Sequence, residues 1–307
     1  MLRLAAAACA LALAIPAAAL AEDAPYVEWA NHLPALPGQF TPNTFDDCAD
    51  ADPACVQATL DEMYRRYGEL IAADCDHNAV FALTYIRVTE IYAENAHNGF
   101  FEEEDFLARE DAVFARLYFD SYDAWAAGED AAVPPAWQMA FDTARDRAVP
   151  ALGNMLQGIN AHVNRDMPFM LAGLGLTKPD GTSRKRDHDA MNELLNRVYD
   201  DVIAEMTQRF DPSVDDFDPP GALDNLAGFQ ILPLWREGVW RNAELLTLAT
   251  TPEARAGVAQ WIELYALLQA QMIRSGFGYR GDQDSTERDA HCAAQDNSVE
   301  DARPPAE

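Results

Sequence analysis

Apolar residues recur along most of this chain with the spacing of an α-helix, and strand patterns are almost absent. Residues three and four apart share one face of a helix, so this periodicity predicts amphipathic helices that each bury one face. The pattern is clearest over 137–147, 151–171, 191–210, 234–248 and 254–273. Breaks rich in Gly, Pro, Asp or Ser separate the segments. The chain is therefore predicted to be all-α, a single bundle of roughly eight helices with short connections.

The two ends of the chain differ from this helical body in composition. Residues 1–21 have a basic start, a short Ala/Leu-rich core and small residues before Glu22, which is the pattern of a secretory signal peptide. Residues 22–47 are rich in proline and predict an extended arm laid over the bundle. Residues 280–307 are acidic and predict a disordered tail. The all-α domain is thus expected to span 48–279.

The predicted leader indicates an exported protein, either periplasmic or secreted. No later segment reaches the length of a membrane span, so stable membrane insertion is not expected. The chain has 22 Lys plus Arg against 51 Asp plus Glu, a net charge of -29, and this excess repels phosphate backbones and anionic bilayers. Nucleic acid is therefore excluded as a partner, and an unidentified small molecule is expected. A saline habitat is the simplest explanation of the charge. The sequence does not indicate an oligomeric state.

Export also explains the cysteines. The predicted mature chain keeps Cys48, Cys55, Cys75 and Cys292, an even number in an oxidising compartment, which favours two disulfides. Cys55 and Cys75 flank a predicted helix whose ends lie roughly 30 Å apart, so these two cannot pair. We favour Cys48–Cys55 as a small loop and Cys75–Cys292 as a link from the tail to the body. A zinc–cysteine site is the alternative, but the close CxxC pair typical of such sites is missing.

The segment 150–170 carries the most distinctive polar residues. His162 and Asp166 lie four apart on a predicted buried helix, so their side chains project from one face. Pro168 has no amide N–H, which leaves the carbonyl of Asn164 without its helical donor and opens or kinks the backbone beside the pair. Such a pair can bind a metal or transfer a proton as a catalytic group. The alternative is a buried histidine whose hydrogen bonding is satisfied by its own aspartate.

Other polar residues are candidates to complete a site around this pair. His77 begins one predicted helix and His188 and Asp189 begin another, so these three join His162 and Asp166 as candidate metal ligands. The neighbouring Asp76 and Asp187 fit helix capping better than ligation.

Candidate substrate-binding residues are Asn160, Asn164 and Arg236. The two asparagines repeat the four-residue spacing of the His/Asp pair and could orient it or a substrate. Arg236 could receive an anion at the polar opening, although the segment around it also fits ordinary surface ion pairs. The chain lacks a GxSxG elbow, a Gly-rich phosphate loop and an HExxH helix, so common serine-hydrolase, P-loop and metalloprotease chemistry is not indicated.

Five segments together carry a family resemblance: CDHNAVFALTYIRVTE, LAREDAVFARLYFDSYDAW, PPAWQMAFDTAR, GINAHVNRDMP and DHDAMNELLNRVYDDV. Their order resembles the bacterial family catalogued as domain of unknown function 5995, over approximately residues 55–273. The most specific motif is GxNAHxNxD, which begins at Gly158. The resemblance implies an all-helical single domain and brings no activity with it.

A weaker similarity is to zinc-dependent phospholipase C and nuclease bundles, in which a helical HxxxD is followed after a loop by HxxxE. His162 and Asp166 fit the first element, but His188 is followed four residues later by Asn192 instead of Glu, which puts a multi-zinc site in doubt. Acyltransferases also use an HxxxD pair, usually with Gly after the Asp, where this chain has Met167.

Two functions follow from these patterns. The first is a metal-dependent hydrolase, with zinc as the expected metal, that acts on an ester or phosphoester at His162 and Asp166. The second is a non-enzymatic secreted helical module, for binding or structure, whose polar centre only fixes the packing. An enzyme needs a concave pocket that reaches the pair, and a scaffold needs none.

Overall fold

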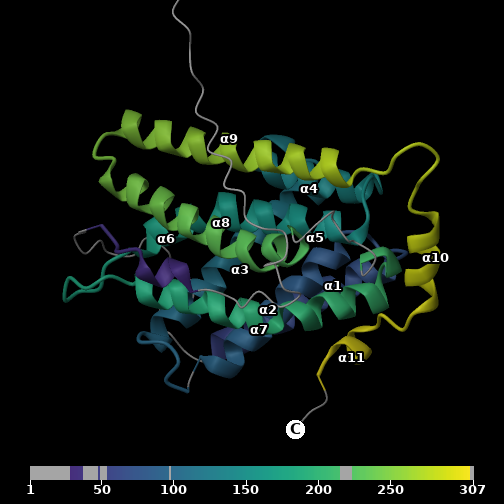
Figure 1. Ribbon diagram of the computed structural model, residues 1–307, viewed down its shortest axis with the longest axis horizontal. Coiled ribbons are helices and arrows are strands. Elements are labelled where there is room, and N and C mark those ends of the chain that lie inside the picture. The colour runs from purple at the N-terminus through teal and green to yellow at the C-terminus, as the bar shows by residue number, and fades with distance from the viewer. Residues whose placement is uncertain (1–27, 37–47, 49–53, 97, 215–222, 305–307) are drawn as a thin grey trace, which may run out of the picture.

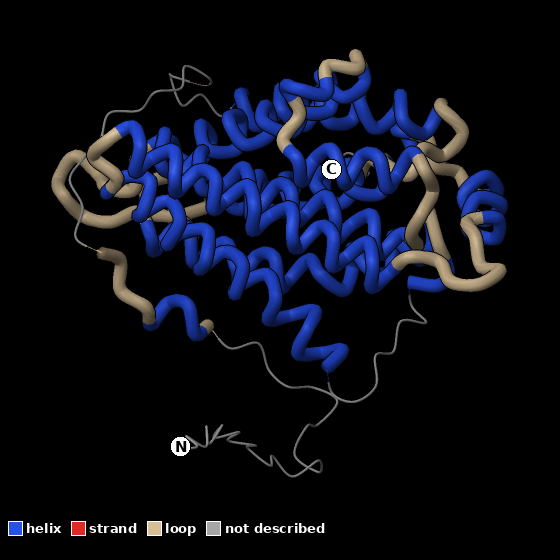
Figure 2. The backbone as a smooth tube through the Cα atoms, turned by 90° about the horizontal axis from the view of Figure 1, so that it is seen from above, coloured by secondary structure: helices blue, strands red, loops and turns tan. Residues whose placement is uncertain are grey.

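The computed structural model describes residues 28–36, 48, 54–96, 98–214 and 223–304, with the backbone alone for 223–230. The predicted all-α class is confirmed, because the regular elements of the described residues are helices (Figure 2). These residues otherwise contain an isolated β-bridge between Thr177 and Ser183. The α-helices are α1 (Ala54–Ala72), α2 (Ala79–Asn95), α3 (Glu104–Ala126), α4 (Pro135–Arg145), α5 (Ala151–Ile159), α6 (Met167–Leu174), α7 (Lys185–Arg209), α8 (Leu223–Leu248), α9 (Pro252–Phe277), α10 (Thr286–Ala294) and α11 (Val299–Ala302). A π-helix, η3 (Asn160–Asp166), joins α5 to α6, and short 3₁₀ helices are η1 (Trp29–His32), η2 (Asp130–Ala132) and η4 (Pro212–Val214).

The predicted eight helices correspond to α1–α4, the continuous run α5–η3–α6, and α7–α9. These long helices lie roughly along the same direction, with α9 beside α8 on one side of the bundle and α2 beside α7 (Figure 1). The run α5–η3–α6 is central, because η3 contacts α3, α4, α8 and α9. The segment with the most distinctive polar residues is therefore enclosed by the rest of the fold.

Close packing of α5 on α2 depends on Gly158, the first residue of the GxNAHxNxD motif. A Cβ atom at this position would lie 2.2 Å from Cγ of Phe81, well inside contact distance. The Phe81 ring in turn makes edge contacts with Trp137 and His162, at centroid distances of 5.4 and 5.9 Å. The absence of a side chain at Gly158 thus allows the aromatic cluster to reach the histidine.

The cysteine pairs are the ones expected from the sequence. The structure joins Cys48 to Cys55 and Cys75 to Cys292. Cys75 follows the end of α1, so the helix that excludes a Cys55–Cys75 pair is present.

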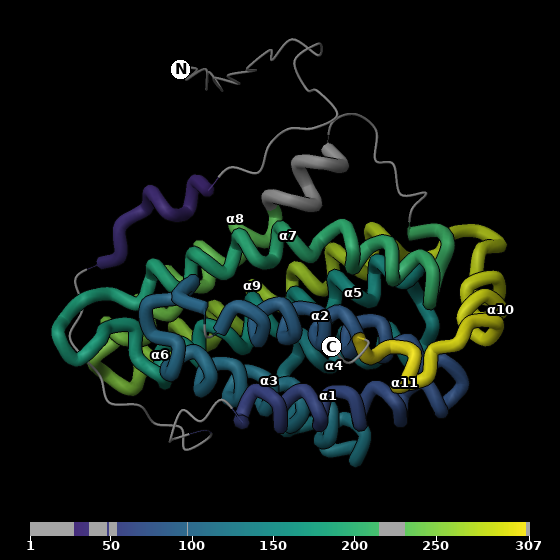
Figure 3. The backbone as a smooth tube through the Cα atoms, turned by 90° about the horizontal axis from the view of Figure 1, so that it is seen from below, coloured from purple at the N-terminus to yellow at the C-terminus, as the bar shows by residue number. Residues whose placement is uncertain are grey.

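The prediction of a disordered tail is wrong for residues 280–304. This segment forms α10 and α11 at one end of the bundle (Figure 3). Besides the disulfide of Cys292, buried Arg288 donates to the Asn154 side chain at 2.6 Å, and His77 pairs with Asp289 at 2.7 Å. The acidic composition was misleading because this segment is fixed by a covalent bond and buried polar contacts more than by apolar burial.

The other end of the chain is described only in part. The predicted signal peptide and most of the predicted arm lie outside the described residues. Within the arm, η1 interrupts the expected extended conformation, and Lys185 and Arg241 donate to the carbonyls of Ala30 and Pro34. The described part of the arm therefore packs on α7 and α8. None of the described helices has both the length and the apolar composition needed to cross a membrane.

The substitution Gly158→Ala is expected to lower the free energy of unfolding by about 1–3 kcal/mol, because the new methyl group must displace Phe81. Gly238→Ala is the matched control: Gly238 also lies within a helix, but nothing would touch its Cβ. This control is expected to leave stability unchanged or raise it by up to about 1 kcal/mol. Chemical denaturation of both variants tests the difference, and an equal effect of the two changes would contradict the close approach.

Candidate functional site

The backbone that carries His162 and Asp166 changes its hydrogen-bond pattern where the sequence predicts an opening. In η3 the amide of Met167 donates to the carbonyl of His162, five residues earlier, as in a π-helix. Pro168, the next residue, has no hydrogen to donate to the carbonyl of Asn164. The predicted opening beside the pair is therefore confirmed. Single π-turns inside α-helices often occur at functional sites.

Asp166 is the fixed centre of this segment. Its Oδ2 accepts from Trp137 Nε1 at 2.8 Å and lies 3.1 Å from His162 Nδ1, while its Oδ1 accepts from Arg165 at 2.9 Å. An ionised carboxylate only accepts hydrogen bonds, so Nδ1 of His162 must carry the proton. The other ring nitrogen, Nε2, is then an unprotonated acceptor.

The imidazole of His162 is buried among aromatic side chains. It is 2% exposed and stacks on Phe114 with ring centroids 3.5 Å apart, and the Tyr85 ring lies 4.6 Å away. Burial lowers the pKa of His162, and the partly opposing effect of Asp166 does not reverse this direction. The ring is therefore neutral near pH 7. Its Nε2 has no hydrogen-bond partner among the residues that the structure describes.

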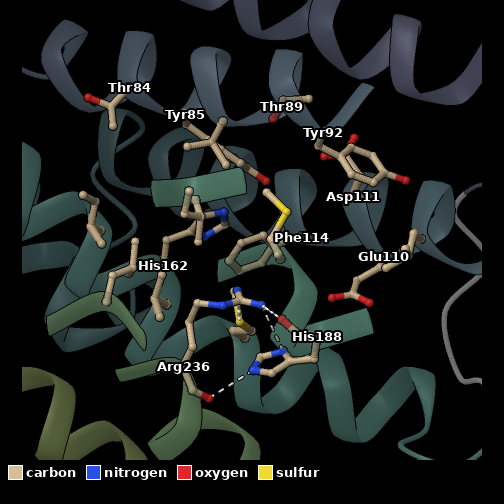
Figure 4. A pocket seen from close by; sticks show the side chains of 18 of the residues that line it. Thr84, Tyr85, Thr89, Tyr92, Glu110, Asp111, Phe114, His162, His188 and Arg236 are labelled. Carbon is tan, nitrogen blue, oxygen red and sulfur yellow. Dashed lines mark hydrogen bonds between the residues drawn. The ribbon is translucent and has the colours of Figure 1, made fainter. Parts of the chain in front are cut away.

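A cavity of about 130 Å³ lies beside this ring. It is bounded by α2, α3, η3, α7 and α8 (Figure 4). Most of its lining is aromatic or aliphatic, and the apolar side chains are Phe81, Tyr85, Val88, Tyr92, Phe101, Leu107, Phe114, Ile159, Val163, Met167, Met191, Leu195 and Leu232. The pocket that an enzyme or a binding protein needs thus reaches His162.

Several buried polar atoms of the lining have no hydrogen-bond partner in the described part of the chain. They are the hydroxyls of Tyr85, Thr89 and Tyr92, Oδ2 of Asp111 and Nε2 of His162. Leaving such an atom unpaired costs about 1–3 kcal/mol, so buried polar groups are normally satisfied. Five of them around one cavity indicate a place where an entering molecule supplies the missing hydrogen bonds.

Two adjacent carboxyl groups, Glu110 and Asp111, also line the cavity, and sequence reasoning missed them. Burial raises the pKa of Glu110 to about 7, although the charge of Arg236 opposes this. Burial also raises the pKa of Asp111 to about 8, with a further contribution from Glu110. The signal was readable: Leu107, Glu110, Asp111 and Phe114 follow the i, i+3, i+4, i+7 spacing of a buried helix face.

Arg236 and His188 form the wall opposite Asp111 (Figure 4). His188 Nε2 lies 3.1 Å from the carbonyl of Arg236, which can only accept, so this nitrogen carries the proton. Its Nδ1 then accepts from the Arg236 guanidinium at 3.3 Å, and the same guanidinium donates to Asn192 at 2.8 Å. Burial, followed by the charge of Arg236, lowers the pKa of His188. Arg236 therefore lines the cavity, and its role in receiving an anion stays a prediction.

Comparison with protein families gives one match, to the model described as Family of unknown function (DUF5995), over residues 56–276. The chain belongs to this family. The matched region includes every helix that lines the cavity, whereas α10 and α11 lie beyond it. No curated protein and no solved structure matches the chain. The weaker similarity to zinc-dependent bundles finds no support in these matches.

The two predicted substrate-binding asparagines of this DUF5995 protein lie away from the cavity. Asn164 donates to the side chain of Asn160 at 3.0 Å, and Asn160 donates to the carbonyl of Ala266 in α9 at 2.9 Å. A helix turns by roughly 100° per residue, so Asn160 and His162, two apart, face opposite sides. The asparagines attach η3 to α9.

The predicted metal ligands are not gathered either. His77 pairs with Asp289, Asp189 pairs with Lys185 at 2.8 Å, and both nitrogens of His188 are bound within the protein. Across the described part of the chain, no three His, Cys, Asp or Glu side chains converge as a ligand set. A divalent metal in this DUF5995 protein therefore stays a prediction from the sequence.

Asp111→Asn is expected to become more stabilising as pH rises from about 5 to about 8. The folded pKa of Asp111 is raised above its unfolded value, so its favourable contribution is complete at low pH and is lost as pH rises toward 8. An amide has no proton to lose. Denaturant titrations across this range should show the variant gaining about 1 kcal/mol or more relative to the unsubstituted protein.

Asp142→Asn provides the control for this measurement. Hydrogen bonds from Gln138, Trp125 and Arg145 outweigh burial and lower the pKa of Asp142. Its stabilising contribution is thus lost only below about pH 4, and the effect of the substitution should be constant from about pH 5 to 8. A flat response at Asp111 as well would show that its carboxyl is solvated.

Proposed function

We propose that this protein binds a small, largely apolar molecule with a polar group in the cavity between α2, α3, η3, α7 and α8. The observation that carries the proposal is the ring of unpartnered polar atoms around apolar walls, namely those of Tyr85, Thr89, Tyr92, Asp111 and His162. Ligand sites in proteins combine apolar lining with a few convergent polar groups in this way.

The size of the cavity sets the size of the bound group. An engineered apolar cavity of about 150 Å³ in another protein binds benzene. The cavity here, at about 130 Å³, suits a single ring or a short branched chain. Two disulfides fit a protein exported to an oxidising compartment, so the expected ligand is met in the periplasm or outside the cell.

The neutral probe 2-phenylethanol is expected to bind and to raise the melting temperature, since a ligand that binds only the folded state stabilises it. Met191→Trp should remove this effect, because Met191 lines the cavity and the larger indole fills it. Met272→Trp is the matched control at a surface position that is 68% exposed, and it should leave binding intact. Calorimetry and thermal shifts measure both, and equal binding by the two variants would place the ligand elsewhere.

A second candidate function is hydrolysis of an apolar ester or phosphoester bound in this cavity. The observation that favours it is the Asp166–His162 pair, which presents an unprotonated Nε2 to the cavity. A neutral imidazole oriented by a carboxylate can take a proton from an attacking water as a general base and then give this proton to the alkoxide that leaves as the ester bond breaks. The hydroxyls of Tyr85 and Tyr92 could donate to the oxyanion that develops. No step requires the predicted zinc, although a metal would supply Lewis-acid activation if bound.

His162→Gln is expected to reduce hydrolysis of 2-phenylethyl acetate by at least about a hundredfold while 2-phenylethanol still binds. His32→Gln, at an exposed position, is the control and should change neither property. Asp166→Asn with metal analysis separates the mechanisms: a metal site should lose metal and activity together, and a general base should lose activity alone. Hydrolysis that is unaffected by His162→Gln would leave binding without catalysis as the function.

A further inference from the structure

Glu110 and Asp111 are partly buried and differ in their charge partners from other partly or fully buried acids of the protein. Asp189 pairs with Lys185, Glu205 with Arg87 and Glu244 with Arg241, each at 2.6–2.8 Å. Neither Glu110 nor Asp111 forms an ion pair with any residue in the described part of the chain. Two acidic groups therefore face an apolar cavity without a bound cation from the protein.

We propose that the ligand of this cavity is a small primary amine, whose ammonium group binds at the carboxyl of Asp111, with the carboxyl of Glu110 beside it. This inference rests on the proposed binding function and names the chemical class of the ligand. It predicts that the charge missing from the protein side of the site is brought by the ligand.

The hydrogen-bond acceptors near Asp111 fit an ammonium group. Thr89 is 1% exposed and Tyr92 is 6% exposed, and the hydroxyls of both lack protein partners, as does Oδ2 of Asp111. All three residues line the cavity, and Figure 4 shows Asp111 beside Tyr92. An ammonium has three N–H donors and no acceptor, so it can use one acceptor from each of these side chains. A neutral alcohol can donate to Asp111 and accept from the two hydroxyls, but it brings no positive charge to the carboxyl group.

The positively charged residue of the cavity lining, Arg236, lies away from Asp111. The charge of Arg236 acts to lower the pKa of Glu110, whereas the pKa of Asp111 is raised by burial and then by the charge of Glu110. The Arg236 guanidinium is already bound to Asn192 and His188. The carboxyl of Asp111 mostly carries a proton near pH 7 in the free protein, so an ammonium group that binds there displaces this proton and pairs with the resulting carboxylate, away from the arginine.

Aromatic walls complete the fit. The ring of Tyr92, which Figure 4 shows beside Asp111, stands 5.9 Å from the ring of Phe101, and aromatic faces attract ammonium groups. The apolar part of the ligand then lies toward Phe114 and His162. An arylalkyl amine of the size of 2-phenylethylamine combines these requirements.

The test compares 2-phenylethylamine with 2-phenylethanol by calorimetry, with salt at about 0.15 M to screen surface charge. The amine is expected to bind at least about tenfold more tightly than the alcohol. Asp111→Asn should remove the preference for the amine over the alcohol. Asp105→Asn, on the exposed side of the same helix, should preserve the tenfold preference.

The outcomes separate the two proposals. Binding of the alcohol as tightly as the amine, or a preference that survives Asp111→Asn, overturns the amine and leaves the binding function in place. Amine binding that survives the cavity-filling Met191→Trp is surface attraction and also overturns it. Failure of both probes to bind overturns both proposals. Because the wild-type comparison needs no variant, the inference stays testable even if Asp111→Asn does not fold.

Discussion

The carboxylate of Asp166 is the interaction on which the centre of this protein depends. A buried charge is tolerated only when donors surround it, and here they come from Trp137 in α4 and from Arg165 and His162 in η3. These bonds hold a π-turn that Pro168 begins by removing one α-helical hydrogen bond. They also decide which nitrogen of His162 carries the proton. One carboxylate thus fixes the backbone, the orientation of the ring and the acceptor that faces the cavity.

The cavity itself results from side chains at positions where a helix normally presents aliphatic residues. Phe81, Thr84, Tyr85, Val88, Thr89 and Tyr92 follow the core-facing positions of α2, and Glu110 and Asp111 occupy those of α3. Hydroxyls and carboxyls at such positions do not interlock as Leu or Ile would, and their desolvation is unfavourable. Aromatic packing around Trp137 and Phe81 fills the adjoining space.

The sequence predicted those features of the structure that depend on interactions between residues close together in the chain. The helices, the opening at Pro168 and the His162–Asp166 hydrogen bond each follow from residues within one turn, and helix length left few choices for the disulfides. The predicted metal ligands do not converge, because His77 pairs with Asp289 and Asp189 pairs with Lys185. The proximity of His77 and Asp289 depends on tertiary packing. The ordered C-terminal segment was missed for the same reason. The acids of α3 were missed because a charged pair on an amphipathic helix ordinarily faces solvent.

His188 shows how a structural histidine differs from one that has a nitrogen available for a ligand. Both imidazoles are buried beside the same cavity, and burial lowers the pKa of both. Both nitrogens of His188 are bound to Arg236, as expected of a ring whose role is packing. His162 uses one nitrogen and leaves the other toward the cavity. A scaffold gains nothing from that unsatisfied acceptor, which costs about 1–3 kcal/mol, and a bound molecule that donates to it offsets the cost. The contrast within one chain therefore favours a ligand site over a purely structural pair.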